Sequence, residues 1–432
     1  MSSKPLTYEK IGSGTYGNVY RIDSNTVRKD CSIVSEDLYN IETTTIREIV
    51  FLSTYSHPHI RGVNLIEFMD LKVSMYMPEG GVPLDEWVKK TTLTQRLSII
   101  PRIVAQICSV LSYLENMDMS HGDLKPSNIL INSSNDIKII DWGACCYLPH
   151  RQTVNGCTEQ FSAPELLDTP VRNGPPADIF SLGMIVRFLI YGTFETMRWI
   201  KWCCHSKGKV DILNSGENGA DLDFVRKCQP FLSADYKSRP TAAEICDWKE
   251  LESYKTKDSP SYKHSNGRLD KVVWTDSNLF SPDRRIKVVK LICMLATKFN
   301  CTESIMPSVQ LFEEYAVSDG YRTMSESNIN IYAGACLMIA SCLLNCSLHL
   351  VDFLKLISPD ISCMKFYTVL LDILEHFSCE VYRLAFTDKL ERISVKHLQS
   401  LLLTPDIMNT NHEQRMELYT KLIADETKSL LA

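Results

Sequence analysis

Two acidic residues and one amide, all in one short stretch, form the set of side chains best suited to chemistry. Asp123 precedes the apolar run 129–131, and Asp141 follows a second apolar run, 137–140. Two strands joined by a tight turn would bring both carboxylates to the open end of a hairpin, with the Asn128 amide beside them. Phosphoryl transfer needs this combination, because a base must meet the acceptor hydroxyl and oxygen atoms must hold Mg²⁺. The alternative is a solvated hairpin whose acids are incidental.

The same stretch resembles the catalytic loop and the metal-binding loop of protein kinases. His-Gly-Asp123 stands where these enzymes carry H-R-D, and Asp141-Trp-Gly stands where they carry D-F-G. The resemblance implies that Asp123 is the catalytic base and that Lys125 stabilises charge on the transferred phosphoryl group. It also implies that Asn128 and Asp141 bind Mg²⁺. Lys125, by its position, marks serine/threonine rather than tyrosine specificity.

A glycine-rich segment near the N-terminus predicts a phosphate-binding loop. Its three glycines let the backbone lie close to phosphate groups and offer N–H donors to them. A dinucleotide-binding fold is the rival interpretation, but the pattern resumes as a strand after the loop, which favours a β-hairpin. By resemblance to kinases, the nucleotide would be held by Ile11, Gly12, Gly14, Gly17, Val19 and Lys29. Lys29 would neutralise the α- and β-phosphates; an ordinary surface lysine is the alternative.

A helix carrying an acidic residue is expected over 41–52. Apolar residues form a partial stripe along it, and Glu48 is the candidate for the acid that kinases use to hold the strand lysine and thereby the nucleotide. The string TTTIREI resembles the PSTAIRE helix of cyclin-dependent kinases, and GSGTYGNVY resembles their glycine loop. In the buried-strand run 73–77, Met75 and Met77 would face the adenine of ATP through backbone groups.

Three further motifs extend the kinase resemblance to about residues 7–250. Ser-Ala-Pro-Glu165 resembles the A-P-E that closes the activation segment, and Asp178-Ile-Phe-Ser-Leu-Gly resembles the D-x-W-S-x-G of a large-lobe helix. Ser-Arg239-Pro-Thr resembles the R-P-T near the end of kinase domains. The resemblance implies that Arg239 pairs with Glu165 in a structural role.

Departures from the kinase pattern bear on regulation and substrate. Gly122 replaces the arginine that normally receives an activation-loop phosphate, so activity is expected not to depend on phosphorylation of Thr153. Ser162 replaces an arginine that supports a preference for proline after the acceptor. Thr15 and Tyr16 match inhibitory phosphorylation sites of cyclin-dependent kinases. Phosphotransferases that act on aminoglycosides or choline also carry His-Gly-Asp in this loop. A small-molecule phosphotransferase is therefore a distant alternative.

The C-terminal part of the chain predicts helices only. A polar linker over 253–282 leads to helices expected at 283–298, 303–316, 326–345, 348–357 and 363–382, followed by a helical tail over 386–432. Two of these helices resemble helices 3 and 5 of a cyclin box. Cys342 and Leu370 occupy the places where cyclins usually carry the Lys and Glu that contact the kinase. An unrelated helical bundle is the alternative.

The composition of the chain limits which partners it is expected to bind and in which cellular compartment it is expected to act. A net charge of −6 without a long basic run argues against nucleic acid. Sixteen cysteines without a CxxC, and without a secretory signal, predict free thiols in the cytoplasm or nucleus. The uncharged run 331–351 is nominally long enough to cross a membrane, but its polar residues favour a buried core helix followed by a turn.

Together these features predict an α+β bilobal protein-kinase fold followed by an all-α cyclin-like helical domain. The kinase domain is expected over 1–252, divided near residue 77 into a small and a large lobe, and the cyclin-like domain over 283–385. The predicted activity transfers the γ-phosphate of ATP, with Mg²⁺, to protein Ser/Thr hydroxyls. Activation would come in cis from the cyclin-like domain, or from a host cyclin because Ile46, Arg47 and Glu48 of the PSTAIRE-like helix are retained. A kinase and a cyclin-like domain in one chain resemble the fusions found in large DNA viruses. A catalytically weak scaffold that binds host kinases or cyclins is the alternative of a different class.

Overall fold

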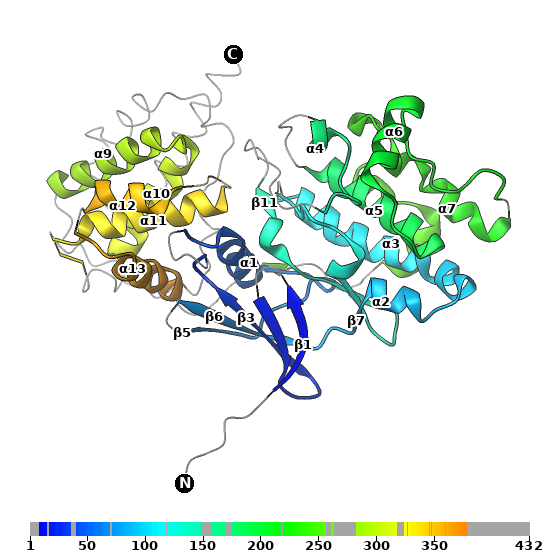
Figure 1. Ribbon diagram of the computed structural model, residues 1–432, viewed down its shortest axis with the longest axis horizontal. Helices are drawn as coiled ribbons and strands as arrows, with labels where there is room; N and C mark the ends of the chain where they lie inside the picture. Colours follow the sequence, from blue (N-terminus) through cyan, green and yellow to red (C-terminus); the bar gives the residue numbers. More distant parts are fainter. Residues whose placement is uncertain are drawn as a thin grey trace, which may run out of the picture.

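The structure is a computed structural model of the chain (Figure 1). It describes residues 8–14, 17–35, 40–69, 71–117, 119–147, 158–168, 174–217, 219–255, 261–262, 282–317, 324–325, 327–344, 346, 348–358 and 360–377. The predictions for Thr15, Tyr16, Thr153 and the tail over 386–432 lie outside these residues.

The small lobe is an antiparallel sheet with one helix against it. The strand order is β1-β2-β3-β6-β5. The strands are β1 (Glu9–Gly14), β2 (Gly17–Arg21), β3 (Thr26–Ser32), β5 (Leu65–Met69) and β6 (Lys72–Pro78). The predicted turn between β2 and β3 is held by the Asn25 N–H, which donates to the Asp23 carboxylate at 2.7 Å. Because β1, β2 and β3 follow one another as hairpins, the strand–helix alternative for the glycine loop is excluded.

Helix α1 (Thr43–Thr54) is the helix expected after β3. Every residue from Thr45 to Thr54 is buried, including Arg47 and Glu48. The chain turns extended at Tyr55 and forms the short strand β4 (Tyr55–Ser56). A helix buried around its whole circumference must have packing partners on both sides.

The large lobe is mainly helical and is built on α3 (Leu93–Glu115). A reciprocal pair of hydrogen bonds between Thr92 and Gln95 caps the start of α3. This helix is long and apolar enough to cross a membrane, but most of it is buried within the protein, as in the core helix of a globular domain. The other α-helices that the structure describes in this lobe are α2 (Leu84–Lys89), α4 (Glu165–Asp168), α5 (Pro175–Tyr191), α6 (Met197–Lys207), α7 (Asp223–Lys227) and α8 (Ala242–Cys246).

A short hairpin carries the candidate chemistry of the large lobe. Strands β9 (Ile129–Ile131) and β10 (Ile137–Ile139) pair antiparallel, with Ile129 opposite Ile139. These are the two apolar runs from which the sequence predicted a hairpin, so that prediction is confirmed. The short strand β7 (Val82–Pro83) pairs with β9 on its other edge. The bilobal kinase fold predicted from the sequence is therefore confirmed.

Among the residues that the structure describes between 282 and 377, the regular secondary structure is helical, with turns and loops between the helices. Its helices are α9 (Pro282–Lys298), α10 (Ile305–Val317), α11 (Ile329–Leu343), α12 (Leu350–Ile357) and α13 (Cys363–His376). Residues Ile331 to Leu343 of α11 are all buried, as expected for a core helix. A Cβ atom on Gly334 would collide with the Ile357 side chain, which explains the need for a small residue there. Arg285 and Glu313 form a buried ion pair between α9 and α10 at 2.5 Å.

The helical region and the kinase region meet at α1. Helix α11 packs against α1 (Figure 1), on the side away from the large lobe. Within the predicted linker, β12 (Ser261–Tyr262) pairs antiparallel with β4, so that Tyr262 lies opposite Tyr55. The predicted polar linker over 253–282 therefore contributes a short strand at these two residues. Their pairing depends on a strand edge that is remote in sequence.

Candidate active site

Lys29 lies between two carboxylates from different elements. Its Nζ is 2.5 Å from the Glu48 carboxylate on α1 and 4.0 Å from Asp141. Burial works against the charge of Lys29, but Glu48 and Asp141 outweigh it and raise the pKa of this lysine above its ordinary value. On Glu48 burial has the opposite effect and raises the pKa of the carboxyl, while the Lys29 ammonium counteracts this rise. The ammonium group is thus held, charged, beside the Asp141 loop.

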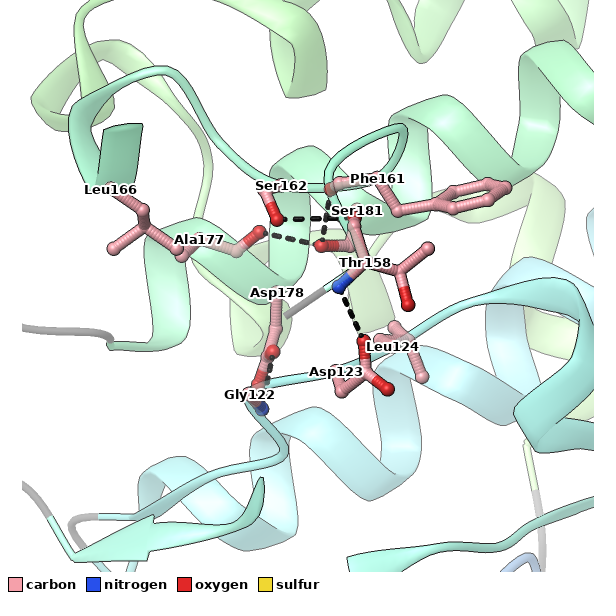
Figure 2. Close-up of a pocket in the computed structure, with 10 residues that line it drawn as sticks. All are labelled: Gly122, Asp123, Leu124, Thr158, Phe161, Ser162, Leu166, Ala177, Asp178 and Ser181. Atoms are coloured by element: carbon pink, nitrogen blue, oxygen red, sulfur yellow. Dashed lines mark hydrogen bonds between the residues drawn. The ribbon is translucent and has the colours of Figure 1, made fainter. Parts of the chain in front are cut away.

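The Asp123 side chain is the centre of the catalytic loop. Lys125 Nζ donates to Asp123 Oδ2 at 2.5 Å and to the Thr158 hydroxyl at 2.8 Å. Asn128 Nδ2 donates to the Asp123 carbonyl at 2.9 Å. The Thr158 N–H donates to Asp123 Oδ1 at 3.0 Å, as Figure 2 shows. The structure therefore brings Asp123, Lys125 and Asn128 together, as the sequence predicted, and adds Thr158.

Thr158 was not identified from the sequence. It belongs to the segment between Asp141 and Glu165, where a hydroxyl residue close to the A-P-E motif was the available signal. No spacing rule connects it with Asp123, because its contact depends on how the whole segment returns to the catalytic loop.

Asp178 holds the backbone of the catalytic loop. The N–H groups of His121 and Gly122 donate to its two carboxylate oxygens at 2.7 and 3.1 Å. Burial raises the pKa of Asp178, and His121 together with these two N–H donors opposes that effect. Gly122 has φ +82°, a backbone conformation that favours glycine. Sequence reasoning found the motif that contains Asp178 but not this role.

The Asp141 loop is joined to α1 by an aromatic stack. Trp142 is fully buried, and its ring lies 4.0 Å from the Phe51 ring with planes 12° apart. The centre of the His121 ring is 4.7 Å from that of the Trp142 ring, with the two planes tilted by 58°. A Cβ on Gly143 would come within 3.0 Å of the Thr44 side chain, so the loop also approaches the start of α1 closely. These contacts fix Asp141 relative to both Glu48 and Asp123.

The glycine loop and the predicted adenine-contacting strand lie on either side of β3. Gly12 faces Val19 in the β1–β2 hairpin, and Val19 faces Lys29 on β3. On the other edge of β3, Lys29 faces Met75 and Val27 faces Met77. Of the remaining predicted residues, Gly14 ends β1, Gly17 begins β2 and Ile11 is exposed on β1. Their contacts with a nucleotide remain predictions.

The donor chemistry of this site suits Mg²⁺ and a nucleotide triphosphate. Asp141 offers a carboxylate and Asn128 an amide oxygen, both ligands that Mg²⁺ accepts. Asp141 is partly exposed, with 32% of its side chain accessible, and Lys29 lies next to it. The residues present therefore fit a metal ion bridged to phosphate groups.

The Glu165–Arg239 pair closes the activation segment onto the large lobe. Arg239 donates to the two carboxylate oxygens of Glu165 at 2.6 and 2.8 Å, and its side chain is fully buried. The same guanidinium donates to the carbonyls of Ser233 and Pro176. A bidentate buried pair of this kind fixes geometry rather than chemistry. The predicted partnership is confirmed.

Comparison with known proteins agrees with this geometry. Residues 6–249 match the protein kinase domain family. The chain is 33% identical over 201 residues to CTD kinase subunit alpha of Schizosaccharomyces pombe, which covers 43% of this chain and 33% of that protein. It is 33% identical over 310 residues to calcium-dependent protein kinase 5 of Plasmodium berghei, covering 66% and 52%. It is 31% identical over 196 residues to a protein of Acanthamoeba polyphaga mimivirus named as serine/threonine-protein kinase L673, covering 42% and 35%.

The chain spans between a third and about half of the length of these three relatives. The family match, by contrast, covers more than half of this chain and includes the catalytic loop, the Asp141 loop, α1 and the glycine loop. The chain belongs to the protein kinase family.

Proposed function

We propose that this chain is a serine/threonine protein kinase activated in cis by its own C-terminal helices. The observation that carries the proposal is the Lys29–Glu48 ion pair at 2.5 Å, formed by a helix that α11 packs against. Glu48 can meet Lys29 only while α1 lies close to the sheet. Whatever holds α1 there therefore controls how Lys29 is positioned.

In the proposed reaction, each side chain of the site has one task. Asp123 accepts the proton of the acceptor Ser or Thr hydroxyl, and Lys125, bonded to Asp123 and Thr158, stabilises charge on the transferred group. Lys29 holds the phosphates from the small lobe. Asp141 and Asn128 would hold Mg²⁺, which would supply positive charge to neutralise the phosphate oxygens. The stacking of Trp142 on Phe51 fixes the position of Asp141 relative to α1.

Support for activation in cis comes from the far side of α1. Ile46 and Val50 lie opposite Glu48 on the helix, yet both are fully buried. Burial raises the pKa of Cys342 on α11 to about 12, and Arg47 and Glu42 act on this thiol in opposite directions. The end of α11 thus lies within electrostatic range of the start of α1. By the resemblance to a cyclin box, Cys342 stands at the position where cyclins usually carry a lysine.

We interpret the C-terminal helices as cyclin-like on this arrangement, together with the resemblance of two of them to a cyclin box. One relative is named as a kinase subunit, which accords with a helical partner, and another is from Acanthamoeba polyphaga mimivirus. A host cyclin could therefore act on α1 in place of α11. The proposed compartment is the cytoplasm or nucleus, and none of the described cysteines forms a disulfide.

The test is γ-phosphate transfer by the full chain to a panel of proteins, peptides and small alcohols. We expect Mg²⁺-dependent transfer to Ser/Thr of proteins, abolished by Lys29→Met and unaffected by Lys72→Met, which replaces an exposed lysine elsewhere on the small-lobe sheet. Residues 1–252 alone should bind ATP but transfer much more slowly. Transfer only to small alcohols would indicate a small-molecule phosphotransferase. Absence of transfer to every acceptor would favour a scaffold.

A further inference from the structure

A row of basic and aromatic side chains lies on one exposed face of α6. We call it the α6 stripe, and it consists of Arg198, Lys201, Trp202 and His205. Their spacing of three, four and seven residues puts them on one side of the helix. All four are exposed, and 56% of Trp202 is accessible. The opposite side of α6, with Ile200 and Cys203, is buried in the lobe.

The surroundings of the stripe are positively charged. Segment 196–209 contains four Lys and Arg residues and no acid, in a chain whose net charge is −6. Lys207 and Lys209 share a single carboxylate, that of Asp211, at 3.0 and 3.4 Å. Lys207 also lies 5.7 Å from the centre of the Trp202 ring. The local charge is therefore opposite in sign to that of the whole chain.

Two phenylalanines link the start of α6 to the pocket where a protein acceptor must bind. Phe161 lines the pocket that contains Asp123 (Figure 2). Its ring is 5.7 Å from that of Phe194, which is 55% exposed and precedes α6. On the other side, Cys204 of α6 is within electrostatic range of Glu165 and Arg239, which anchor the end of the activation segment. Figure 1 shows α6 beside α4.

We propose that the α6 stripe binds an acidic segment of the protein substrate, close in sequence to the acceptor hydroxyl. This inference rests on the proposed kinase function and names the substrate class. Arg198 and Lys201 would pair with substrate carboxylates, while Trp202 and Phe194 offer apolar surface between them. Nucleic acid and anionic membranes are disfavoured, because the chain as a whole carries a net charge of −6 and has no long basic run. The position next to the Asp123 pocket selects a protein substrate.

The test compares two peptides with the same acceptor serine, one flanked by aspartates and one by asparagines. With the full chain, we expect kcat/KM to be at least about fivefold higher for the acidic peptide, mainly through KM. The double variant Arg198→Glu/Lys201→Glu should lose or reverse this preference while keeping kcat for the neutral peptide. Lys72→Glu, a charge reversal on the small lobe, should keep the preference. Added salt should reduce it.

Equal kcat/KM for both peptides in the wild type would overturn the inference. Binding of phosphatidylserine vesicles or of duplex DNA that the double variant loses, without any peptide preference, would also overturn it in favour of that ligand. If the wild type transfers phosphate to no peptide, the proposed kinase function fails instead. In that case, fluorescence anisotropy of the labelled acidic peptide tests the α6 stripe separately. If the stripe binds the peptide, binding must be lost in the double variant and kept in Lys72→Glu.

Discussion

Phe51 of α1 and Trp142 of the Asp141 loop stack face to face, with ring centres 4.0 Å apart. This contact joins the helix that carries Glu48 to the loop that carries Asp141. Tyr55 extends the stack at 5.1 Å from Phe51, at the start of β4. Displacement of α1 would therefore disturb both the partner of Lys29 and the predicted metal ligand.

Substitution of Phe51 tests this coupling. We expect Phe51→Leu to lower the free energy of unfolding by about 1–2 kcal/mol, through the lost aromatic pair and imperfect packing. It should also lower kcat severalfold. Phe231→Leu is the matched control, because Phe231 is equally buried and stacks on Trp248 at 5.6 Å. A fall in kcat of the same size in both variants would mean that stability alone is responsible.

Substitutions of the two acids should have different kinetic effects. Asp123→Asn should lower kcat by about 10²–10⁴, the usual contribution of a positioned base, while ATP still binds. Asp141→Asn should weaken the binding of Mg·ATP itself, because it removes a carboxylate ligand. Binding can be followed by titration with a fluorescent ATP analogue at several Mg²⁺ concentrations. An Asp123→Asn protein with wild-type kcat would rule out Asp123 as the base.

The α1–α11 contact should control activity in the full chain. Cys342→Arg would place a second cation near Arg47 in a buried position, which costs free energy and should push α11 away from α1. We expect kcat to fall at least about tenfold. This corresponds to a change of about 1.4 kcal/mol in the free-energy difference between the active and the displaced position of α1. Met364→Arg, at an exposed position of α13, should leave kcat unchanged. Wild-type activity in Cys342→Arg would contradict activation in cis.

The pairing of β12 with β4 predicts a second link between the connection and α1. Ser261→Pro/Tyr262→Pro removes both backbone N–H donors of β12. We expect faster hydrogen exchange at Tyr55 and Ser56 and a partial loss of activity. Ser261→Ala/Tyr262→Phe keeps the backbone donors and should behave as wild type. Unchanged exchange in the proline variant would show that the pair adds nothing to the stability of β4.

Buried His57 predicts loss of stability in acid. Burial lowers its pKa from 6.5 to about 4, and His59 and Lys138 add to the effect. Because the folded-state pKa is depressed, the stabilisation is complete above pH 6.5 and decreases as the pH falls toward 4. Between pH 7.5 and 5.0 the expected loss in the free energy of unfolding is about 2 kcal/mol, by linkage.

Urea unfolding at these two pH values measures the loss. His57→Asn should show a smaller difference between them, whereas His349→Asn, whose side chain is 60% exposed, should show the wild-type difference. A His57→Asn protein with the full acid sensitivity would assign the effect to other groups.

The sequence alone determined the features that depend on neighbouring residues. The catalytic hairpin followed from two apolar runs around a turn, and the bounds of α9 and α12 lie within two residues of prediction. Helix α13 begins at the predicted residue 363 but ends at His376, before the predicted end at 382, with Phe377 as its C-cap. The roles of Asp123, Lys29 and Glu165 came from resemblance, because their motifs are short and contiguous.

Only the tertiary structure decided which remote residues meet. It placed Thr158 on Lys125, the carboxylate of Asp178 under the catalytic loop, and β12 on β4. It also buried both sides of α1 between the sheet and α11, where the sequence showed only a partial apolar stripe. The physical reason is that hydrophobic periodicity indicates only which face of a helix or strand is buried, and local propensity depends only on residues close in sequence. A contact between residues that are about 30 to 290 positions apart depends on how the whole chain packs, and no single stretch of sequence carries the information for it.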